Sequence, residues 1–406
     1  MTDKRVPSLL LLTERYAPDV GGVARSAKRI ATSLTELGLN VDVLAWTKSL
    51  QPGQLQTHSD SEAGDAANGG CTVHRLGLFA NWDSSFQHTF NVLEWLHDRN
   101  RYDAVWGHYV YPAGFAAVMF GESLGLPSTV SARGNDIDRL MFPPGDFSRL
   151  LWTLQRASVV STVSDDLAKK IDMLLGYDRE SIKLPNVVDL NTFAPISPNE
   201  SQQLRAKHGL SSGELVLGFC GELRHKKGLP FLLNCLRDLN QGRQARLLVI
   251  GSVRPREQRQ LKSFGLDYPA LKERLTITGH QDDPEEIAQL LHVCDVLLFP
   301  SLWEGVPNAL LEAMACGKLV IASNAGGIPE IVEHGSNGVL VPKDQLHRLG
   351  EAILETMALP VETRQAISTK ARRFCEQLAE RQVERAALNK VIQRLLSDYE
   401  PLSNSE

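Results

Sequence analysis

The sequence predicts an α/β protein of two domains, each built around a doubly wound parallel sheet. The chain opens with an apolar run at residues 9–12, a helix over residues 23–37 and another apolar run at 41–45, which together form a strand–helix–strand unit. A further buried run at residues 215–219 starts the same alternation again. With 406 residues, the chain is long enough for two domains of ordinary size.

The composition is that of an ordinary globular protein and excludes several classes. The net charge of −5 argues against a general nucleic-acid binder. The first apolar run is too short for a signal peptide, and no stretch approaches the roughly 20 apolar residues of a membrane span, so we expect a cytoplasmic protein. A peripheral contact with the inner face of a membrane stays open. Reduced core thiols are expected, rather than a metal or disulfide framework, for the scattered cysteines Cys71, Cys220, Cys235, Cys294, Cys316 and Cys375.

The first loop of the N-terminal domain carries two adjacent glycines, Gly21 and Gly22. They follow the first strand and precede the first helix, where a backbone without Cβ atoms lets a phosphate come close. A plain tight turn explains them as well. The polar residues 48–70 are interpreted as a mobile surface excursion, after which a strand at 72–76 and a helix around 86–97 resume the pattern.

Polar side chains follow two later strands of this domain. His108 comes at the carboxyl end of one strand, and Arg133 and Asp136 follow the strand at residues 128–131. At this strand end, His108 is expected to face a crevice that can bind a ligand. The alternative is that His108 is an ordinary structural histidine. Arg133 keeps its charge and cannot act as a base, so it is expected to bind a hydroxyl or phosphate or to position Asp136. A simple surface pair of Arg133 with Asp136 is the competing interpretation.

The second domain begins with a basic loop. Residues 196–212 are polar and are interpreted as the linker. After the strand at 215–219 come four side chains in a row that carry or can take a positive charge, Arg224, His225, Lys226 and Lys227. Such a cluster suits a diphosphate, whose charges would otherwise need a metal. A solvated basic loop is the alternative.

A short helix near the end of the second sheet predicts a phosphate site between two carboxylates. The strand at residues 296–299 ends before Glu304, a helix runs over residues 307–315 with Pro307 at its first position, and Gly317 ends it. The free N–H groups where this helix begins attract anions. Glu304 and Glu312 can accept hydrogen bonds from hydroxyls, so the pattern indicates a sugar nucleotide. Two solvated charges beside a surface helix are the alternative.

The same stretch resembles the E-x7-E signature of the retaining glycosyltransferases of family 4, with Glu304 and Glu312 as its two acids. The runs AGGIPE at residues 325–330 and GVLV at 338–341 resemble the family's C-terminal half. The resemblance covers nearly the whole chain. It implies the GT-B fold, in which two Rossmann-like domains face each other across a cleft and the C-terminal helix crosses back to the first. The expected domains are therefore 1–195 with 381–406, on the acceptor side, and 196–380, which binds the nucleotide sugar.

The resemblance also implies a reaction. A hexose moves from a nucleotide-diphosphate sugar, expected to be UDP-linked, to a hydroxyl acceptor with retention of configuration. His108 and Glu304 are the expected catalytic residues, with His108 near the transferred sugar and Glu304 on the sugar's outer hydroxyls. Glu312 holds the ribose. The expected substrate-binding residues are Gly21, Gly22, Arg133, Asp136, Arg224, Lys227, His280, Val306, Pro307, Asn308, Ala309, Leu310 and Glu312.

Three positions depart from the family pattern. Arg133 stands where many relatives carry histidine, and Val187 stands where PNGVD-like segments carry glycine. Glu222 occupies the position of an arginine that binds the diphosphate, so we expect Arg224 to supply that cation, oriented by Glu222.

No cofactor and no metal are expected beyond the sugar nucleotide itself, and the partners are that donor and a hydroxyl acceptor, without nucleic acid. The oligomeric state stays open. Two alternatives remain: a UDP-sugar 2-epimerase on the same fold, and a catalytically inactive subunit that binds sugar nucleotides.

Overall fold

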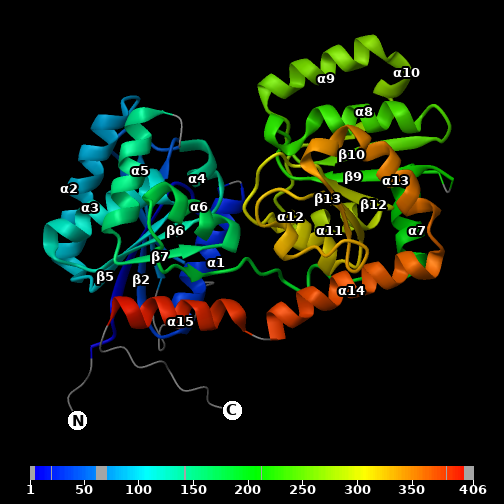
Figure 1. The fold of residues 1–406 in the computed structure, drawn as a ribbon. Coiled ribbons are helices and arrows are strands. Elements are labelled where there is room, and N and C mark those ends of the chain that lie inside the picture. The colour runs from blue at the N-terminus through cyan, green and yellow to red at the C-terminus, as the bar shows by residue number, and fades with distance from the viewer. Residues whose placement is uncertain are drawn as a thin grey trace. The chain divides into compact units, whose positions relative to one another are not determined.

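The computed structural model describes residues 5–19, 21–60, 71–140, 143–211, 213–380 and 382–396. The chain divides into two compact units, both visible in Figure 1. Unit 1 comprises Met1–Asn186 and Val383–Glu406, and unit 2 comprises Val187–Gln382. Each unit is a sheet of mainly parallel strands with helices between successive strands, which confirms the predicted fold class.

Unit 1 contains an eight-stranded sheet in the order β3-β4-β2-β1-β5-β6-β7-β8, in which only the edge strand β3 runs antiparallel. Its strands are β1 (Ser8–Thr13), β2 (Asn40–Thr47), β3 (Leu55–Ser59), β4 (Cys71–Gly77), β5 (Ala104–His108), β6 (Ser128–Ala132), β7 (Val159–Thr162) and β8 (Ile182–Lys183). Its helices are α1 (Gly22–Glu36), α2 (Trp82–Asn100), the irregular turn η1 (Val110–Gly114), α3 (Phe115–Leu124), α4 (Asn135–Leu140), α5 (Pro144–Arg156), α6 (Asp165–Leu175) and α15 (Val383–Leu395).

The central strand β1 shows why the sheet is covered on both faces. All of its residues are buried, and its leucines alternate between two cores because successive side chains of a strand point to opposite faces. Leu9 and Leu11 join one core and Leu10 and Leu12 the other. The C-terminal helix α15 packs into the first core, which confirms that the end of the chain returns to the N-terminal domain.

Unit 2 contains a six-stranded parallel sheet in the order β11-β10-β9-β12-β13-β14. Its strands are β9 (Leu215–Cys220), β10 (Ala245–Ile250), β11 (Leu275–Ile277), β12 (Val296–Phe299), β13 (Leu319–Ser323) and β14 (Val339–Val341). Its helices are α7 (Pro198–Lys207), η2 (His225–Lys227), α8 (Leu229–Leu239), α9 (Pro255–Asp267), α10 (Pro269–Lys272), α11 (Pro284–His292), α12 (Asn308–Ala315), η3 (Ile328–Glu330), η4 (Lys343–Arg348), α13 (Leu349–Ala358) and α14 (Val361–Glu380). Figure 1 shows α8 and α12 on opposite sides of this sheet.

The order of strands reverses once in each sheet. In unit 1, the chain builds outward from β1 in one direction through β2 and β4, and in the other direction from β5 through β8. In unit 2, the same reversal falls between β9 and β12. Ligands of open α/β sheets bind outside the carboxyl ends of the strands at such a reversal. The loops after β1, β5, β9 and β12 are therefore the places to look for a site.

The segment interpreted as a linker is instead an ordered part of unit 2. Residues 198–207 form α7, which begins with a reciprocal capping box between Ser197 and Glu200. Ser201 Oγ donates to the carbonyl of His292, so this polar helix is fastened to the unit by hydrogen bonds rather than by an apolar face. A polar sequence with several prolines can be either a linker or a surface helix, and only the tertiary contacts distinguish the two.

The boundary between the units falls after Asn186, nine residues before the expected position at 195. The intervening segment belongs to unit 2 because Arg372 Nη1 of α14 donates to the carbonyls of Leu190, at 3.4 Å, and Phe193, at 2.7 Å. The return to unit 1 follows Gln382, two residues from the expected position.

Two further expectations concern single segments. The polar residues 48–70 contain the edge strand β3, so this part is not simply a surface excursion, and residues 61–70 lie outside the described residues. All six cysteines are buried and free, as expected. Among the described helices, none is long and apolar enough to cross a membrane.

Candidate active site

In unit 2, the basic loop and Glu304 lie on either side of the reversal of strand order. Arg224 and η2 follow β9, and Glu304 follows β12, the neighbouring strand. The carboxyl ends of both strands meet at the same edge of the sheet, so two segments about eighty positions apart in the sequence are brought together there.

Close backbone packing holds these loops in register. The N–H of Leu302 donates to the carbonyl of Lys226 at 2.7 Å. Gly228 has a φ of +81°, and a Cβ added there would lie 2.1 Å from the carbonyl oxygen of Pro300. Gly326, at φ +53°, is equally constrained, since its Cβ would lie 1.7 Å from the carbonyl oxygen of Glu304. These two glycines are required because the loops after β9, β12 and β13 approach backbone to backbone.

At the centre of these loops, one carboxylate faces two ammonium groups. Glu304 forms an ion pair with Lys227 and lies 3.6 Å from Lys226 Nζ. All three side chains are largely shielded from solvent, at 13%, 18% and 10% exposure respectively. Burial alone would raise the pKa of Glu304, but the charges of Lys227 and Lys226 outweigh it and hold that pKa below its usual value. Glu304 is therefore ionised at neutral pH.

Lys226 is the residue that the sequence analysis left out of the site. The sequence places Lys226 in the basic loop, but of the two lysines only Lys227 matches the family pattern. The structure buries Lys226 and places its ammonium group beside Glu304 as well. The signal in the sequence was the adjacent pair of lysines, and the 3₁₀ geometry of η2 allows both to reach the same carboxylate.

Glu222, the departure from the family pattern, lies between two arginines. It pairs with Arg224 and accepts from Arg254 Nε at 3.0 Å and Nη2 at 3.3 Å. These two cations lower the pKa of Glu222 although burial opposes them. Glu222 thus pairs with Arg224 and Arg254 alike, and its expected role of orienting Arg224 toward a diphosphate stays a prediction.

The short helix α12 begins one residue later than expected. Asn308 is its first residue and Pro307 is the N-cap, in an extended conformation rather than a helical one. Within the described chain, no side chain caps this end of the helix. The side-chain oxygen Oδ1 of Asn308 is buried and finds no hydrogen-bond partner among the described residues. No capping side chain occupies the backbone N–H groups at this helix end, so these donors and the acceptor Oδ1 of Asn308 can bind a ligand.

The remaining predicted residues of unit 2 differ in exposure. Leu310 is fully buried and Val306 nearly so, which means that only their backbone groups could contact a ligand. Glu312 lies on α12 with 5% exposure. His280 follows β11, the far edge strand of the sheet, and its Nε2 lies 2.8 Å from Oδ1 of Asp282.

In unit 1, the loops at the reversal of strand order carry Gly21 and His108. Gly21 has a φ of +121° and precedes α1, and Gly22 is the first residue of that helix. Both glycines are exposed, and a Cβ at Gly21 would meet only the guanidinium of Arg15, at 4.0 Å. Glycine is therefore needed for the backbone conformation and leaves the start of α1 accessible.

His108 ends β5, as predicted, but its side chain is completely buried. Its Nε2 lies 2.8 Å from Oγ of Ser26 on α1, and its Nδ1 has no hydrogen-bond partner among the described residues. Burial, together with the charges of Arg133 and Arg29, lowers the pKa of His108 well below its usual value. The imidazole is therefore neutral, and contact with a sugar stays a prediction.

Asp136 is a buried structural carboxylate, and the surface pair with Arg133 is wrong. It accepts hydrogen bonds from the backbone N–H groups of Val110, Arg133 and Gly134 at 2.8 to 3.2 Å. The guanidinium of Arg133 turns elsewhere and donates to Oδ1 of Asn186 at 2.5 Å. Burial and the nearby charge of Arg29 lower the pKa of Arg133 to about 10, so it keeps its positive charge at neutral pH.

The described residues contain no group of three or more histidine, cysteine or carboxylate side chains arranged to hold a metal ion. The expectation that no metal is needed stays a prediction.

Comparison with known proteins decides the family. Residues 21–186 match the model described as a glycosyl transferase 4-like domain, and residues 200–374 match the model of glycosyl transferases group 1. The chain belongs to the family 4 glycosyltransferases. The expected enzyme class is thus confirmed at the level of the family.

The known proteins that resemble this glycosyltransferase carry names of several different enzymes. It is 27% identical over 246 residues to N-acetyl-alpha-D-glucosaminyl L-malate synthase of Bacillus anthracis, a match that covers 60% of this chain and 62% of that relative. The match therefore spans less than two thirds of the relative's length.

Two solved structures share the fold of this glycosyltransferase. Sucrose-phosphate synthase from Thermosynechococcus elongatus superposes with a TM-score of 0.80 at 18% identity, covering 97% of this chain and 100% of that one. HepE of Anabaena in complex with UDP-glucose superposes with a TM-score of 0.74 at 20% identity, with 97% and 100% covered. At these identities the two structures support the GT-B fold alone.

Proposed function

We propose that this protein transfers a hexose from a nucleotide-diphosphate sugar to a hydroxyl acceptor, with retention of configuration and without a divalent metal. One observation carries the proposal. Lys226 and Lys227 lie beside Glu304 at the reversal of strand order in unit 2, and the charge of Arg224, which pairs with Glu222, also acts on Glu304. Glu304 is close in sequence to the uncapped start of α12. Such a site can balance two or more negative charges.

The reaction needs charge stabilisation at the leaving group. The bond between the anomeric carbon and the β-phosphate oxygen breaks, and a bond to the acceptor oxygen forms on the same face. The acceptor's proton passes to the departing phosphate. Negative charge grows on the diphosphate as the bond breaks, and the ammonium groups of Lys226 and Lys227 stabilise it.

Glu304 has two roles in this proposal. Without a donor, its single negative charge is shared by the two lysines, which leaves one positive charge uncompensated. When the diphosphate binds, the phosphate oxygens take over the lysines, and the carboxylate turns to the hydroxyls of the sugar. Glu312 holds the ribose hydroxyls, and Arg224, oriented by Glu222, replaces the family's usual arginine on the diphosphate.

In unit 1, we assign Gly21, Gly22 and the neutral His108 to the substrates. The exposed start of α1 offers amide donors to a phosphate. His108 would polarise a sugar hydroxyl through Nδ1, because its Nε2 already faces Oγ of Ser26, and this contact requires the completely buried side chain to become accessible when the substrate binds. HepE binds UDP-glucose, so UDP-glucose is the first donor to test.

A panel of sugar nucleotides tests the proposal. UDP-glucose, UDP-N-acetylglucosamine, GDP-mannose and ADP-glucose are compared by thermal shift and by release of free sugar. One of them should stabilise the protein and be hydrolysed slowly, and Glu312→Ala should abolish both effects. Glu355→Ala, an exposed glutamate on α13, is the control. If none binds, the proposal is wrong.

Other outcomes identify the alternatives. Release of a C2 epimer and free nucleotide in the absence of any acceptor indicates an epimerase. Binding without hydrolysis or transfer indicates an inactive subunit. Activity should survive EDTA, and a loss that Mg²⁺ restores would overturn the metal-independent mechanism.

A further inference from the structure

The loop between β1 and α1 brings an arginine to the start of that helix. The structure describes residues 14–19 of this loop and continues at Gly21, the N-cap of α1. Arg15 is exposed, and a Cβ added at Gly21 would lie 4.0 Å from its Nη1. The guanidinium of Arg15 therefore lies beside the exposed glycines that are proposed to face a phosphate.

The charges at this helix end are the reverse of those that a helix start usually carries. A helix start has a partial positive charge, so acidic side chains are favoured in the first turn. The first turn of α1 contains Arg25 and no acidic residue, and no side chain within the described chain caps it. Together with Arg15, positive charge thus gathers at a positive helix end. A bound anion removes this repulsion, so the arrangement favours a phosphate.

A buried arginine of β4, Arg75, fixes the backbone of the same loop. Its Nη2 donates to the carbonyls of Tyr16, at 3.3 Å, and Ala17. Its Nη1 lies 3.6 Å from Oδ1 of Asp19. Two hydrogen bonds close the turn itself: the N–H of Asp19 donates to the carbonyl of Tyr16 at 2.9 Å, and the N–H of Tyr16 donates to Oδ2 of Asp19 at 3.3 Å. One side chain therefore holds the three loop residues around which the chain turns after Arg15.

The sheet explains why an arginine is needed at this position. Thr13, the last residue of β1, pairs with Ala45 of β2, and Ala45 pairs with Arg75. The three residues form one row, and β2 separates β1 from β4. The loop and the side chain together must therefore span β2. A guanidinium has five N–H donors, so a single long side chain can bind several acceptors there.

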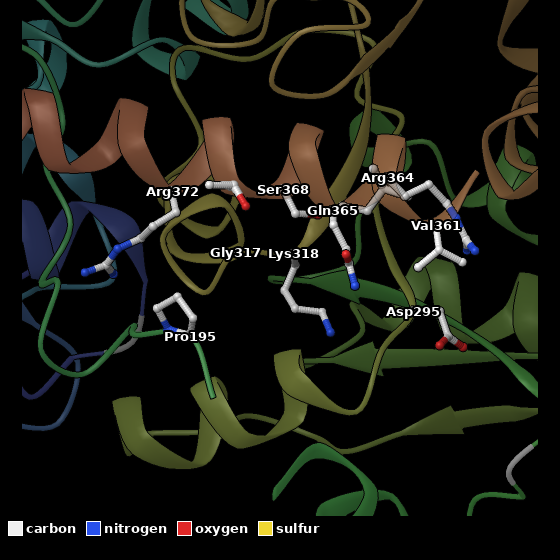
Figure 2. A pocket seen from close by; sticks show the side chains of 11 residues that line it. Pro195, Asp295, Gly317, Lys318, Val361, Arg364, Gln365, Ser368 and Arg372 are labelled. Atoms are coloured by element: carbon white, nitrogen blue, oxygen red, sulfur yellow. The ribbon is translucent and has the colours of Figure 1, made fainter. Parts of the chain in front are cut away.

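The protein uses an arginine in this way in unit 2 as well. Arg372, which Figure 2 shows reaching out from α14, donates from Nη1 to the carbonyls of Phe193, at 2.7 Å, and Ala315, at 2.9 Å. Arg372 fastens backbone segments within that unit. The loop that Arg75 holds differs because it follows β1 at the reversal of strand order, where a ligand is expected.

We propose that Arg15 binds the phosphate that carries the transferred sugar, and that Arg75 is the residue that positions Arg15. The inference rests on the proposed function. Ser26, four residues after the start of α1, lies 2.8 Å from Nε2 of His108, which is assigned to the sugar. The start of α1 is thus about one helical turn from the sugar end of the donor. Charge grows on that phosphate as the sugar leaves, so the contact of Arg15 strengthens in the transition state.

Calorimetric titration of the full chain with UDP and UMP tests the direct contact, because UMP lacks the phosphate that carries the sugar. Arg15→Gln should weaken UDP binding about tenfold, as expected for the loss of one charge-assisted contact, and should leave UMP binding unchanged. Arg156→Gln, exposed on α5, is the control and should bind both nucleotides as the wild type does. If the panel selects a donor with another base, the corresponding diphosphate and monophosphate replace UDP and UMP.

The role of Arg75 has a test of its own. Arg75→Gln should weaken UDP binding by up to about tenfold and spare UMP, whereas a merely structural residue would affect both alike. The double variant with Arg15→Gln should bind UDP about as well as the weaker single variant, because Arg75 acts through Arg15. Arg75→Lys keeps the charge and serves the same comparison if Arg75→Gln fails to fold.

Arg179 provides a matched control for Arg75. It also donates to two backbone carbonyls of unit 1, those of Gln155, at 3.3 Å, and Ala157, which precede β7. These carbonyls lie at the amino end of their strand, away from the loops after β1 and β5. Arg179→Gln should therefore lower the free energy of unfolding and leave the affinities for UDP and UMP unchanged.

Three results would overturn the inference: Arg15→Gln binds UDP as tightly as Arg156→Gln does, its loss extends equally to UMP, or the effects of Arg15→Gln and Arg75→Gln add in full. Each of them leaves the proposed function intact, because the wild type still binds and hydrolyses a sugar nucleotide. If the wild type binds no sugar nucleotide, the proposed function and this inference are both wrong.

Discussion

The two units place charged side chains at equivalent edges of their sheets, but use them differently. In unit 1, the carboxylate of Asp136 is enclosed by three backbone N–H groups, and His108 is buried against Ser26. In unit 2, the carboxylate of Glu304 faces two lysine side chains. Backbone amides cannot leave a carboxylate without unfolding the loop, whereas a lysine can exchange one anion for another.

The comparison shows that position at a strand end does not by itself determine the role of a charge. The charge of Asp136 stabilises the turn before α4 and the start of η1. Near Glu304, one negative charge faces two positive ones in the absence of a ligand, so the lysines remain available to a diphosphate. Four experiments test this distinction between a structural edge and a binding edge.

The largest effect is expected at Lys227. Replacing it with alanine removes a cation from the leaving diphosphate, so kcat/KM should fall by about a thousandfold with the sugar nucleotide that the panel selects. Steady-state kinetics measure it, with Lys262→Ala, an exposed lysine on α9, as control. A decrease of less than about threefold would mean that the basic loop does not contact the donor.

Asp136→Asn should reduce stability rather than binding. In the wild type, three backbone N–H groups donate to the carboxylate of Asp136. In the variant, the NH₂ group of asparagine would face some of these donors, so the free energy of unfolding should fall by about 3 kcal/mol. Urea denaturation measures this loss, and Asp98→Asn, exposed on α2, should change little. Unchanged stability would show that Asp136 has no structural role.

Glu304→Gln should separate binding from transfer. The neutral amide no longer balances Lys226 and Lys227, so calorimetry should show the affinity for UDP rising by up to about tenfold, the equivalent of one modest charged contact. Transfer should fall, because the contact to the sugar is lost. The control is Glu333→Gln, which is exposed. Weaker UDP binding in Glu304→Gln would contradict the counter-ion role.

The smallest effect is a pH dependence in unit 1. The pKa of His108 is lowered by burial, while a histidine in the unfolded chain titrates near pH 6.5. Below that pH the unfolded state takes up a proton that the native state does not, so stability should fall as the pH drops, by at most about 1.4 kcal/mol per pH unit.

His108→Gln should remove this contribution to the slope between pH 6.5 and 5. Denaturation curves at several pH values measure it, and His208→Gln, exposed after α7, should keep the slope of the wild type. An identical slope in His108→Gln would mean that the imidazole is protonated in the native protein.

Much of the fold could be predicted because its signals are local. Apolar runs predicted the strands β1, β9 and β12. Local signals act at helix ends as well, since Ser164 caps α6 by accepting from the N–H of Leu167. The helix α7 was missed because its sequence has no buried face, and its capping box and contacts to His292 and Asp295 decide its place.

By itself, the sequence determined which residues come at the ends of the strands, because hydrophobic runs and turn residues depend only on near neighbours. It therefore identified Lys227, Glu304 and His108 as candidates. Only the tertiary structure decided how each is used, since that depends on groups far apart in the chain. Lys226 faces Glu304 because the loops after β9 and β12 meet, and Asp136 is closed off because the N–H of Val110 reaches it from another strand end. Burial and partners distinguish a charge that holds the fold from one that can receive a substrate.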